Sequence, residues 1–255
     1  MVKGLDKFRK YFACYEDQYV LIGGAACDIV FESNDANFRA TRDLDMVLII
    51  EALTPEFGEK FWKFIVDGKY RNRFVSGRKP QFYRFDKPEE KAFPKMIELF
   101  CRTDFELKNA EGITPIHIAD EISSLSAILL DSDYYNVLLA GRIQKNALSV
   151  LRPEYIILFK AKAYLDLKRI KESEGIGDSK NIKKHKKDIL SKAAELMLER
   201  VTDLPETVLG DIYSFIDSLE QDPFDLNLLK MYGLKNEDIV SLLKDIFEAE
   251  YKIVG

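Results

Sequence analysis

The chain has 255 residues, of which 47% are hydrophobic and 32% charged, a composition typical of a folded globular protein with no membrane-spanning run. Its formal net charge is −5, and its two histidines and three cysteines lack the numbers and spacing of a histidine-rich metal site, a zinc site or a disulfide framework. The charged N-terminus has no apolar run of a secretory signal, so we expect a cytoplasmic protein without a membrane partner.

The first fifty residues predict two strands and two helices. Apolar residues at helical spacing predict a helix over 5–17. The apolar run 19–22 predicts a buried strand that ends in a tight turn at Gly23-Gly24. A helix is expected over 25–31, and the β-branched run 44–50 predicts the second strand.

The next hundred residues predict more strands around one helix. Thr54-Pro55 is typical of a helix start, and this helix is expected to extend to 66. Strands are expected over 81–85 and 95–101. Short apolar runs between 113 and 150 favour a hairpin; these runs are 116–119, 125–130 and 136–139.

Beyond Arg152-Pro153 the pattern becomes helical throughout. Helices are expected over 153–172, 180–200, 205–220 and 236–250. We therefore predict an α+β chain in two domains, with a core of strands and helices at 1–150 and a helical C-terminal domain at 151–255.

Three carboxylates fall on predicted strands. Asp43 and Asp45 are two apart, so a strand projects them to the same face. Glu98 lies in the middle of the strand over 95–101 and joins them if the two strands are neighbours. Adjacent carboxylates repel unless a cation neutralises them, and Mg²⁺ prefers oxygen ligands. Three such acids can hold two cations during phosphoryl transfer.

Gly23 and Gly24 stand between a strand and a helix. Without side chains, their backbone N–H groups can approach a phosphate, and the helix N-terminus adds a favourable dipole. A Gly-Gly pair also serves as an ordinary tight turn. Phosphate binding is therefore indicated only by the combination of this pair with the acidic strand.

This order of strand, Gly-Gly, helix and Arg39-x-Thr41-x-Asp43-Leu44-Asp45 resembles the nucleotidyltransferase superfamily of the DNA polymerase β type. Within that superfamily it is most similar to the AbiEii/AbiGii toxin family. The resemblance implies a mixed β-sheet flanked by helices, followed by helices with a lysine and an aspartate facing the nucleotide. The matching residues are Lys160 or Lys162, and Asp188. The chain departs from the pattern in using Glu98 as the third acid and in carrying two candidate lysines.

The resemblance implies a Mg²⁺-dependent transfer of a nucleoside monophosphate from a nucleoside triphosphate to an acceptor hydroxyl. Asp43, Asp45 and Glu98 would be the catalytic, metal-binding acids. The remaining candidates would bind the nucleotide; they are Gly23, Gly24, Arg39, Thr41, Lys160, Lys162 and Asp188. An RNA acceptor, a toxin or abortive-infection role and a cognate antitoxin protein are expected by the same resemblance. Two alternatives stay open: a small-molecule nucleotidyltransferase of the antibiotic-modifying kind, and a catalytically silent nucleotide-binding module that docks a partner protein.

Positive charge is concentrated in two stretches. Residues 168–187 hold eight Lys or Arg against three acids, and 69–87 hold seven against one. Such runs are usually solvated faces, but beside an anion site they would hold a polyanion such as RNA. His185 lies in the first of these runs and is expected at the surface, whereas His117 is expected to be a hydrogen-bonded, half-buried side chain.

Overall fold

The computed structural model describes residues 3–31, 43–71, 82–102, 128–175 and 179–247. They confirm the predicted α+β class. The chain forms two compact units. The first comprises Met1–Leu130 and Leu138–Arg152, and the second comprises Asp131–Val137 and Pro153–Gly255.

The first unit is built on a mixed six-stranded sheet in the order β3-β4-β2-β1-β6-β5. β1 pairs antiparallel with β2 and parallel with β6, and β2 pairs parallel with β4. The two outer strands are antiparallel to their neighbours. The strands are β1 (Tyr19–Ile22), β2 (Asp43–Leu48), β3 (Phe82–Asp86), β4 (Met96–Phe100), β5 (Arg142–Lys145) and β6 (Leu148–Leu151).

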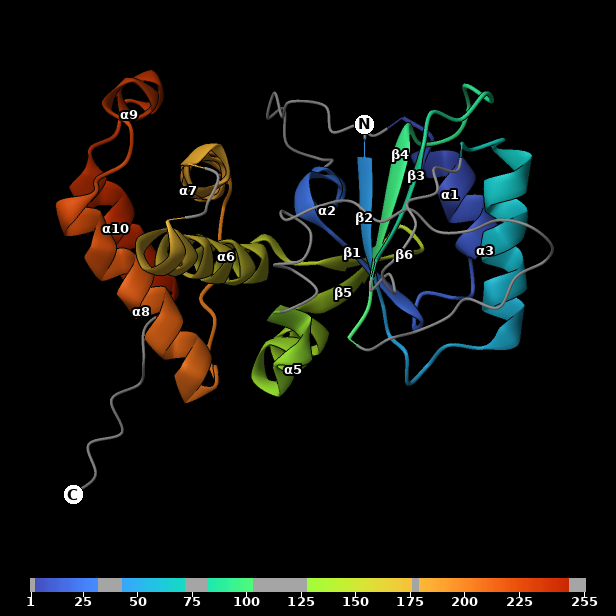
Figure 1. Cartoon of the computed structure of the whole chain (residues 1–255), viewed down its shortest axis with the longest axis horizontal. Helices are drawn as coiled ribbons and strands as arrows, with labels where there is room; N and C mark the ends of the chain where they lie inside the picture. The colour runs from blue at the N-terminus through green and yellow to red at the C-terminus, as the bar shows by residue number, and fades with distance from the viewer. Residues whose placement is uncertain (1–2, 32–42, 72–81, 103–127, 176–178, 248–255) are drawn as a thin grey trace. The chain divides into compact units, whose positions relative to one another are not determined.

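Helices lie on both faces of this sheet (Figure 1). α1 (Leu5–Phe12) and α3 (Pro55–Asp67) pack together through aromatic rings, and α2 (Gly23–Val30) contacts β1, β2 and β6. α3 begins as predicted, because the Phe57 N–H donates to Thr54 Oγ1 at 3.3 Å and satisfies a free donor of the first turn. α1 ends at Phe12, five residues before the expected end.

The register fixes which face each side chain occupies. The Tyr19 ring contacts the ring of Phe8 in α1, so Tyr19 lies on the face covered by α1 and α3. Alternation places Ile22 on the opposite face, and its antiparallel partner is Asp45. The acidic residues therefore lie away from the aromatic core, on the face where α2 begins.

The second unit is helical. α6 and α7 pack along each other, and α6 also contacts α8. Its helices are α6 (Pro153–Glu174), α7 (Ser179–Glu195), α8 (Glu206–Gln221), α9 (Leu226–Tyr232) and α10 (Asn236–Ile246). α9 was not predicted, although Asp225 caps it by accepting from the N–H groups of Asn227 and Leu228.

The hairpin predicted within 113–150 is wrong in its placement. Residues 136–139 belong to helix α5 (Ser132–Ala140), because Asp131 accepts from the N–H of Asp133 at 2.8 Å and starts a helix there. Residues 128–130 are helical too, while 113–127 lie outside the described residues. The hairpin is instead β5–β6, and both turn residues, Asn146 and Ala147, have positive φ, as a two-residue turn between strands requires.

Candidate active site

Charged residues form a row across three neighbouring strands of the first unit. Asp45 in β2 is directly opposite Glu98 in β4, and Glu98 is directly opposite Arg84 in β3. Neighbouring strands are about 4.8 Å apart, and directly opposed residues share a face. Asp43 is two residues before Asp45 and lies on the same face, and both aspartates are half-buried. The structure thus brings the three predicted acids onto one surface.

The first residue of α2 touches this surface. Gly23 has a φ of +70°, in the left-handed region, and a Cβ at this position would overlap the Asp45 carboxylate. Only glycine combines this conformation with so close an approach. Gly24 follows in the first turn of α2, a turn in which no side chain caps the helix. The Gly-Gly pair is therefore part of the helix start rather than a turn before it.

Glu98 has a partner that was not expected from the sequence. Its carboxylate forms an ion pair with Arg84, and the two side chains are only 11% and 23% exposed. Among the described residues, no three His, Cys, Asp or Glu side chains are arranged to hold a metal ion. A role for Glu98 as a third metal ligand thus requires its carboxylate to turn from Arg84, and it stays a prediction.

The predicted partners Arg39 and Thr41 lie outside the described residues, as does His117. Arg84 is the residue of this surface that sequence reasoning missed. The sequence could have indicated this residue, because Arg84 is next to Phe85, a buried residue, in a short strand whose side chains alternate between the two faces of the sheet. That alternation puts Arg84 on the face opposite the core, where the acids also lie.

The two candidate lysines belong to the second unit and differ in their surroundings. Lys160 Nζ is 3.0 Å from Asp188 Oδ2, so two of the predicted residues form an ion pair. Lys162 Nζ lies 3.2 Å from Asp211 Oδ2 and 3.3 Å from Asp166 Oδ1. Tyr134 packs against the Lys162 ammonium and donates to Asp211, so Lys162 is held in a structural network.

His185 is not the surface residue that its lysine-rich neighbourhood suggested. It is half-buried in α7, with Nδ1 away from solvent, beside the Lys160–Asp188 pair. Burial, followed by the positive charge of Lys160, lowers the pKa of His185 from 6.5 to about 4. Burial alone would raise the pKa of Asp188, but Lys160 and Lys192 outweigh it and hold that pKa below its ordinary value.

This neutral histidine predicts a pH dependence of folding. The unfolded chain takes up the proton near pH 6.5, whereas the folded chain does so only near pH 4. The free energy of unfolding should therefore fall by roughly 2 to 3 kcal/mol between these values. His185→Gln should remove this contribution, which denaturant titrations of both proteins from pH 7 to pH 4 would measure. A difference between them that is constant over this range would contradict the assignment.

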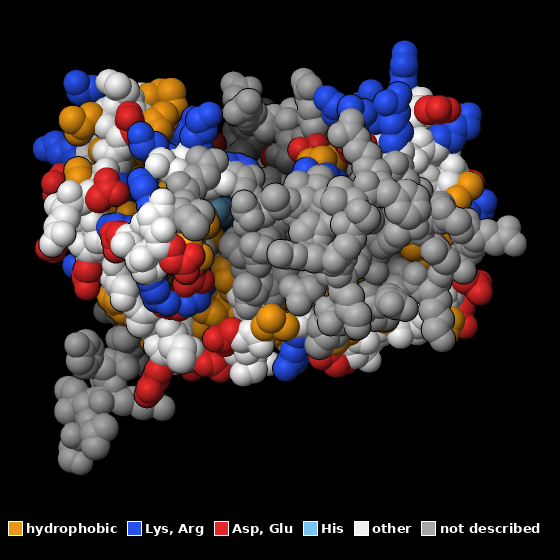
Figure 2. Space-filling view, viewed as in Figure 1, with side chains coloured by type: hydrophobic (Ala, Val, Ile, Leu, Met, Phe, Trp, Pro, Cys, Tyr) orange, Lys and Arg blue, Asp and Glu red, His pale blue; other side chains and the backbone are white. Residues whose placement is uncertain are grey.

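The basic stretch 69–87 is only partly described. Lys69 Nζ is 3.2 Å from Glu90 Oε1, and Arg84 forms an ion pair with Glu98. Figure 2 shows further Lys and Arg side chains at the upper right, over the segment that joins β3 to β4 in Figure 1. The exposed lysines of this segment are Lys87, Lys91 and Lys95.

Cys14, Cys27 and Cys101 form no disulfide with one another; Cys14 is exposed, and Cys27 and Cys101 are buried. In the described part of the chain, every helix is too short or too polar to cross a membrane.

No protein-family model and no curated protein sequence matches the chain. Among solved structures it is similar to an antigenic nucleotidyltransferase-like protein from Paracoccidioides brasiliensis, with 16% sequence identity and a TM-score of 0.48. The match covers 97% of this chain and 96% of that one. A TM-score below 0.5 does not establish a common fold, and we therefore infer function from the residues themselves.

Proposed function

We propose that the chain is a Mg²⁺-dependent nucleotidyltransferase, which moves a nucleoside monophosphate from a nucleoside triphosphate to an acceptor hydroxyl and releases pyrophosphate. The observation that carries the proposal is the close approach of Gly23 to the Asp45 carboxylate, which leaves no room for a Cβ. It brings the start of a helix, which in proteins is a favourable place for a phosphate, next to an acidic surface of the kind that suits a cation. RNA as the acceptor and a toxin role are part of the proposal and rest on the motif resemblance.

The residues of the sheet suit a magnesium ion. Asp43 and Asp45 offer hard oxygen ligands on one face, and the like-charged Glu98 directly opposite Asp45 makes a neighbouring cation favourable. Mg²⁺ held by these aspartates would neutralise charge on the triphosphate and on the atoms that react. Arg84 already neutralises part of the acidic row, which favours a single cation beside Asp43 and Asp45.

The other residues of this surface would position the substrates. The N–H groups of Gly23 and Gly24 would donate to phosphate oxygens at the start of α2. Glu98 would accept the proton of the attacking hydroxyl, and its ion pair with Arg84 holds the carboxylate in place for that task. These assignments use groups that already lie on one face of the sheet.

Lys160 is the better candidate for the lysine that meets the triphosphate. Residues two apart on a helix project about 200° apart, so Lys160 and Lys162 serve different surroundings. Lys162 is held by two aspartates and a tyrosine, whereas Lys160 forms its ion pair with Asp188. A compact ammonium group suits the charge of a leaving pyrophosphate.

The two lysines should therefore respond differently to the same substitution. Lys160→Met is expected to reduce transfer by roughly tenfold or more, since one charge contact with the transition state is lost. Lys162→Met should instead lower the free energy of unfolding by about 1 to 3 kcal/mol, because Asp166 and Asp211 lose their shared cation. Initial rates and denaturant titrations of both variants would test this. A loss of transfer in Lys162→Met and a loss of stability in Lys160→Met would instead assign the triphosphate contact to Lys162.

The function itself is tested by label transfer. The protein is incubated with each labelled nucleoside triphosphate, Mg²⁺ and total RNA, and compared with Asp43→Ala. Labelled RNA that disappears with the substitution supports the proposal. A nucleotide-dependent rise in melting temperature without transfer would instead favour the silent binding module. The absence of both label transfer and a nucleotide-dependent rise in melting temperature would contradict both the transferase and the binding module.

A further inference from the structure

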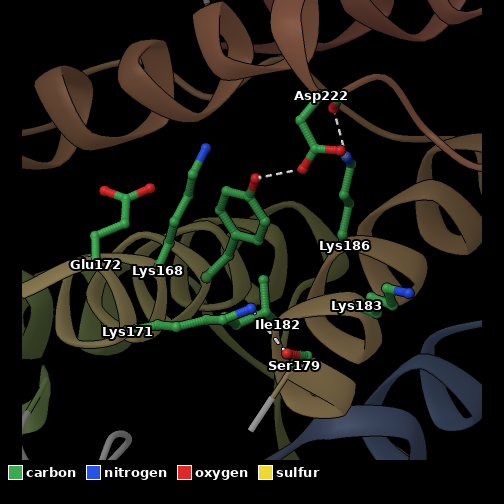
Figure 3. A pocket seen from close by; sticks show the side chains of 9 residues that line it. Lys168, Lys171, Glu172, Ser179, Ile182, Lys183, Lys186 and Asp222 are labelled. Carbon is green, nitrogen blue, oxygen red and sulfur yellow. Dashed lines mark hydrogen bonds and ion pairs between the residues drawn. The ribbon is translucent and has the colours of Figure 1, made fainter. Parts of the chain in front are cut away.

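A cavity of about 360 Å³ opens within the second unit, between the C-terminal half of α6 and the first half of α7 (Figure 3). Its volume lies at the lower end of the range for small-ligand sites. It is lined by Tyr164, Lys168, Lys171, Glu172, Ser179, Ile182, Lys183, Lys186 and Asp222. None of these residues belongs to the candidate site described above.

One acid of the cavity is already neutralised. Lys186 Nζ lies 2.8 Å from Asp222 Oδ1, and the Tyr164 hydroxyl donates to Asp222 Oδ2 at 2.9 Å. Figure 3 shows these contacts at one side of the cavity. Because Lys186 and Asp222 cancel, the remaining charge comes from Lys168, Lys171 and Lys183, opposed only by Glu172 among the lining residues.

The three remaining lysines border the cavity, and their ammonium groups are not paired with carboxylates of the described residues. Lys171 Nζ donates to Ser179 Oγ at 2.8 Å, which links the end of α6 to the start of α7. Within the part of the chain that the structure describes, Lys168 and Lys183 have no carboxylate at ion-pair distance. A concave surface with three such ammonium groups concentrates positive potential, and it stabilises an anion more strongly than a flat surface does.

The start of α7 adds to this potential. Ser179, the first residue of α7, lines the cavity, and the first turn of this helix contains no acid. The positive end of the helix dipole thus borders the cavity, and the Ser179 hydroxyl can donate a hydrogen bond within it.

We propose that this cavity binds a phosphate group, through the ammonium groups of Lys168, Lys171 and Lys183 and the hydroxyl of Ser179. The phosphate is carried either by a small molecule or by a nucleic-acid strand, since both present the same oxygens to lysine. The inference goes beyond the proposed transfer reaction and does not depend on it.

The test is calorimetric titration of the full chain with inorganic phosphate and, separately, with a short single-stranded RNA, without divalent cation or nucleoside triphosphate. The double variant Lys168→Gln, Lys183→Gln should weaken binding by roughly tenfold or more. The control Lys184→Gln, Lys187→Gln removes two exposed lysines of α7 that do not line the cavity, and it should change affinity by about twofold or less.

A third variant should change the affinity in the opposite direction. Glu172→Gln removes the opposing carboxylate, so it should tighten binding by a few-fold. Binding of inorganic phosphate but not of RNA identifies a small-molecule source, and binding of RNA, with or without binding of inorganic phosphate, identifies a nucleic-acid source. Equal losses in the two double variants, or no binding of either probe by the wild type, would overturn the proposal. Because no triphosphate is present, such a failure is separate from a failure of nucleotidyl transfer.

Discussion

Asp45→Asn is expected to reduce nucleotidyl transfer by roughly a hundredfold or more, while the chain stays folded. A carboxylate that holds a catalytic cation contributes several kcal/mol to the transition state, and each 1.4 kcal/mol is about a factor of ten in rate. Asparagine keeps the size of the side chain and removes one of two directly opposed negative charges, Asp45 and Glu98. The free energy of unfolding should change by no more than about 1 kcal/mol.

The matched control for this loss is Glu51→Gln. Glu51 lies beyond the other end of β2, where its carboxylate is 3.4 Å from Arg102, and the change again removes one negative charge. Its transfer rate should stay within about twofold of the wild type, because surface ion pairs contribute little. Initial rates with Mg²⁺ and melting curves would be measured for both variants. An Asp45→Asn rate within about threefold of the wild type would contradict the role of Asp45.

Gly23→Ala is expected to damage both stability and transfer. The φ of +70° is strained for any residue with a Cβ, and the added methyl group would displace the Asp45 carboxylate. We expect the free energy of unfolding to fall by about 1 to 3 kcal/mol and transfer to fall by roughly tenfold or more. Denaturant titration and initial rates would measure the two effects.

Gly210→Ala is the control for that substitution. Gly210 is exposed in the interior of α8, and a Cβ there meets nothing within 4 Å. Alanine favours a helix over glycine, so this variant should gain about 0.5 to 1 kcal/mol and keep its transfer rate. If Gly23→Ala kept its stability and transfer rate as Gly210→Ala does, the close approach of α2 to Asp45 would not contribute to nucleotidyl transfer.

The strands and helices near the site could be predicted because their signals are local. The apolar run 19–22, the two glycines and the alternation of Asp43, Leu44 and Asp45 each follow from properties of a few neighbouring residues. The run 136–139 shows the limit of this reasoning. Short apolar runs suit a strand or a helix, and a single capping residue, Asp131, decided between them.

The partners within the site could not be predicted. Alternation assigns Arg84 and Glu98 to faces of their strands, but their pairing depends on the register of β3 with β4. Similarly, helical spacing shows that Lys160 and Lys162 project in different directions, but it does not say which one meets Asp188. His185 was misplaced because its lysine neighbours dominate the local composition, whereas its burial comes from the packing of α7 on α6.

In the proposed reaction, the α-phosphate of a nucleoside triphosphate moves to the acceptor. The most direct measurement compares triphosphate labelled at the α-phosphate with triphosphate labelled at the γ-phosphate, using the same acceptor RNA and Mg²⁺. We predict that the α-label enters the acceptor, that the γ-label leaves as pyrophosphate, and that both events cease in Asp43→Ala. Entry of the γ-label into the acceptor, or release of the γ-label as inorganic phosphate alone, would contradict nucleotidyl transfer.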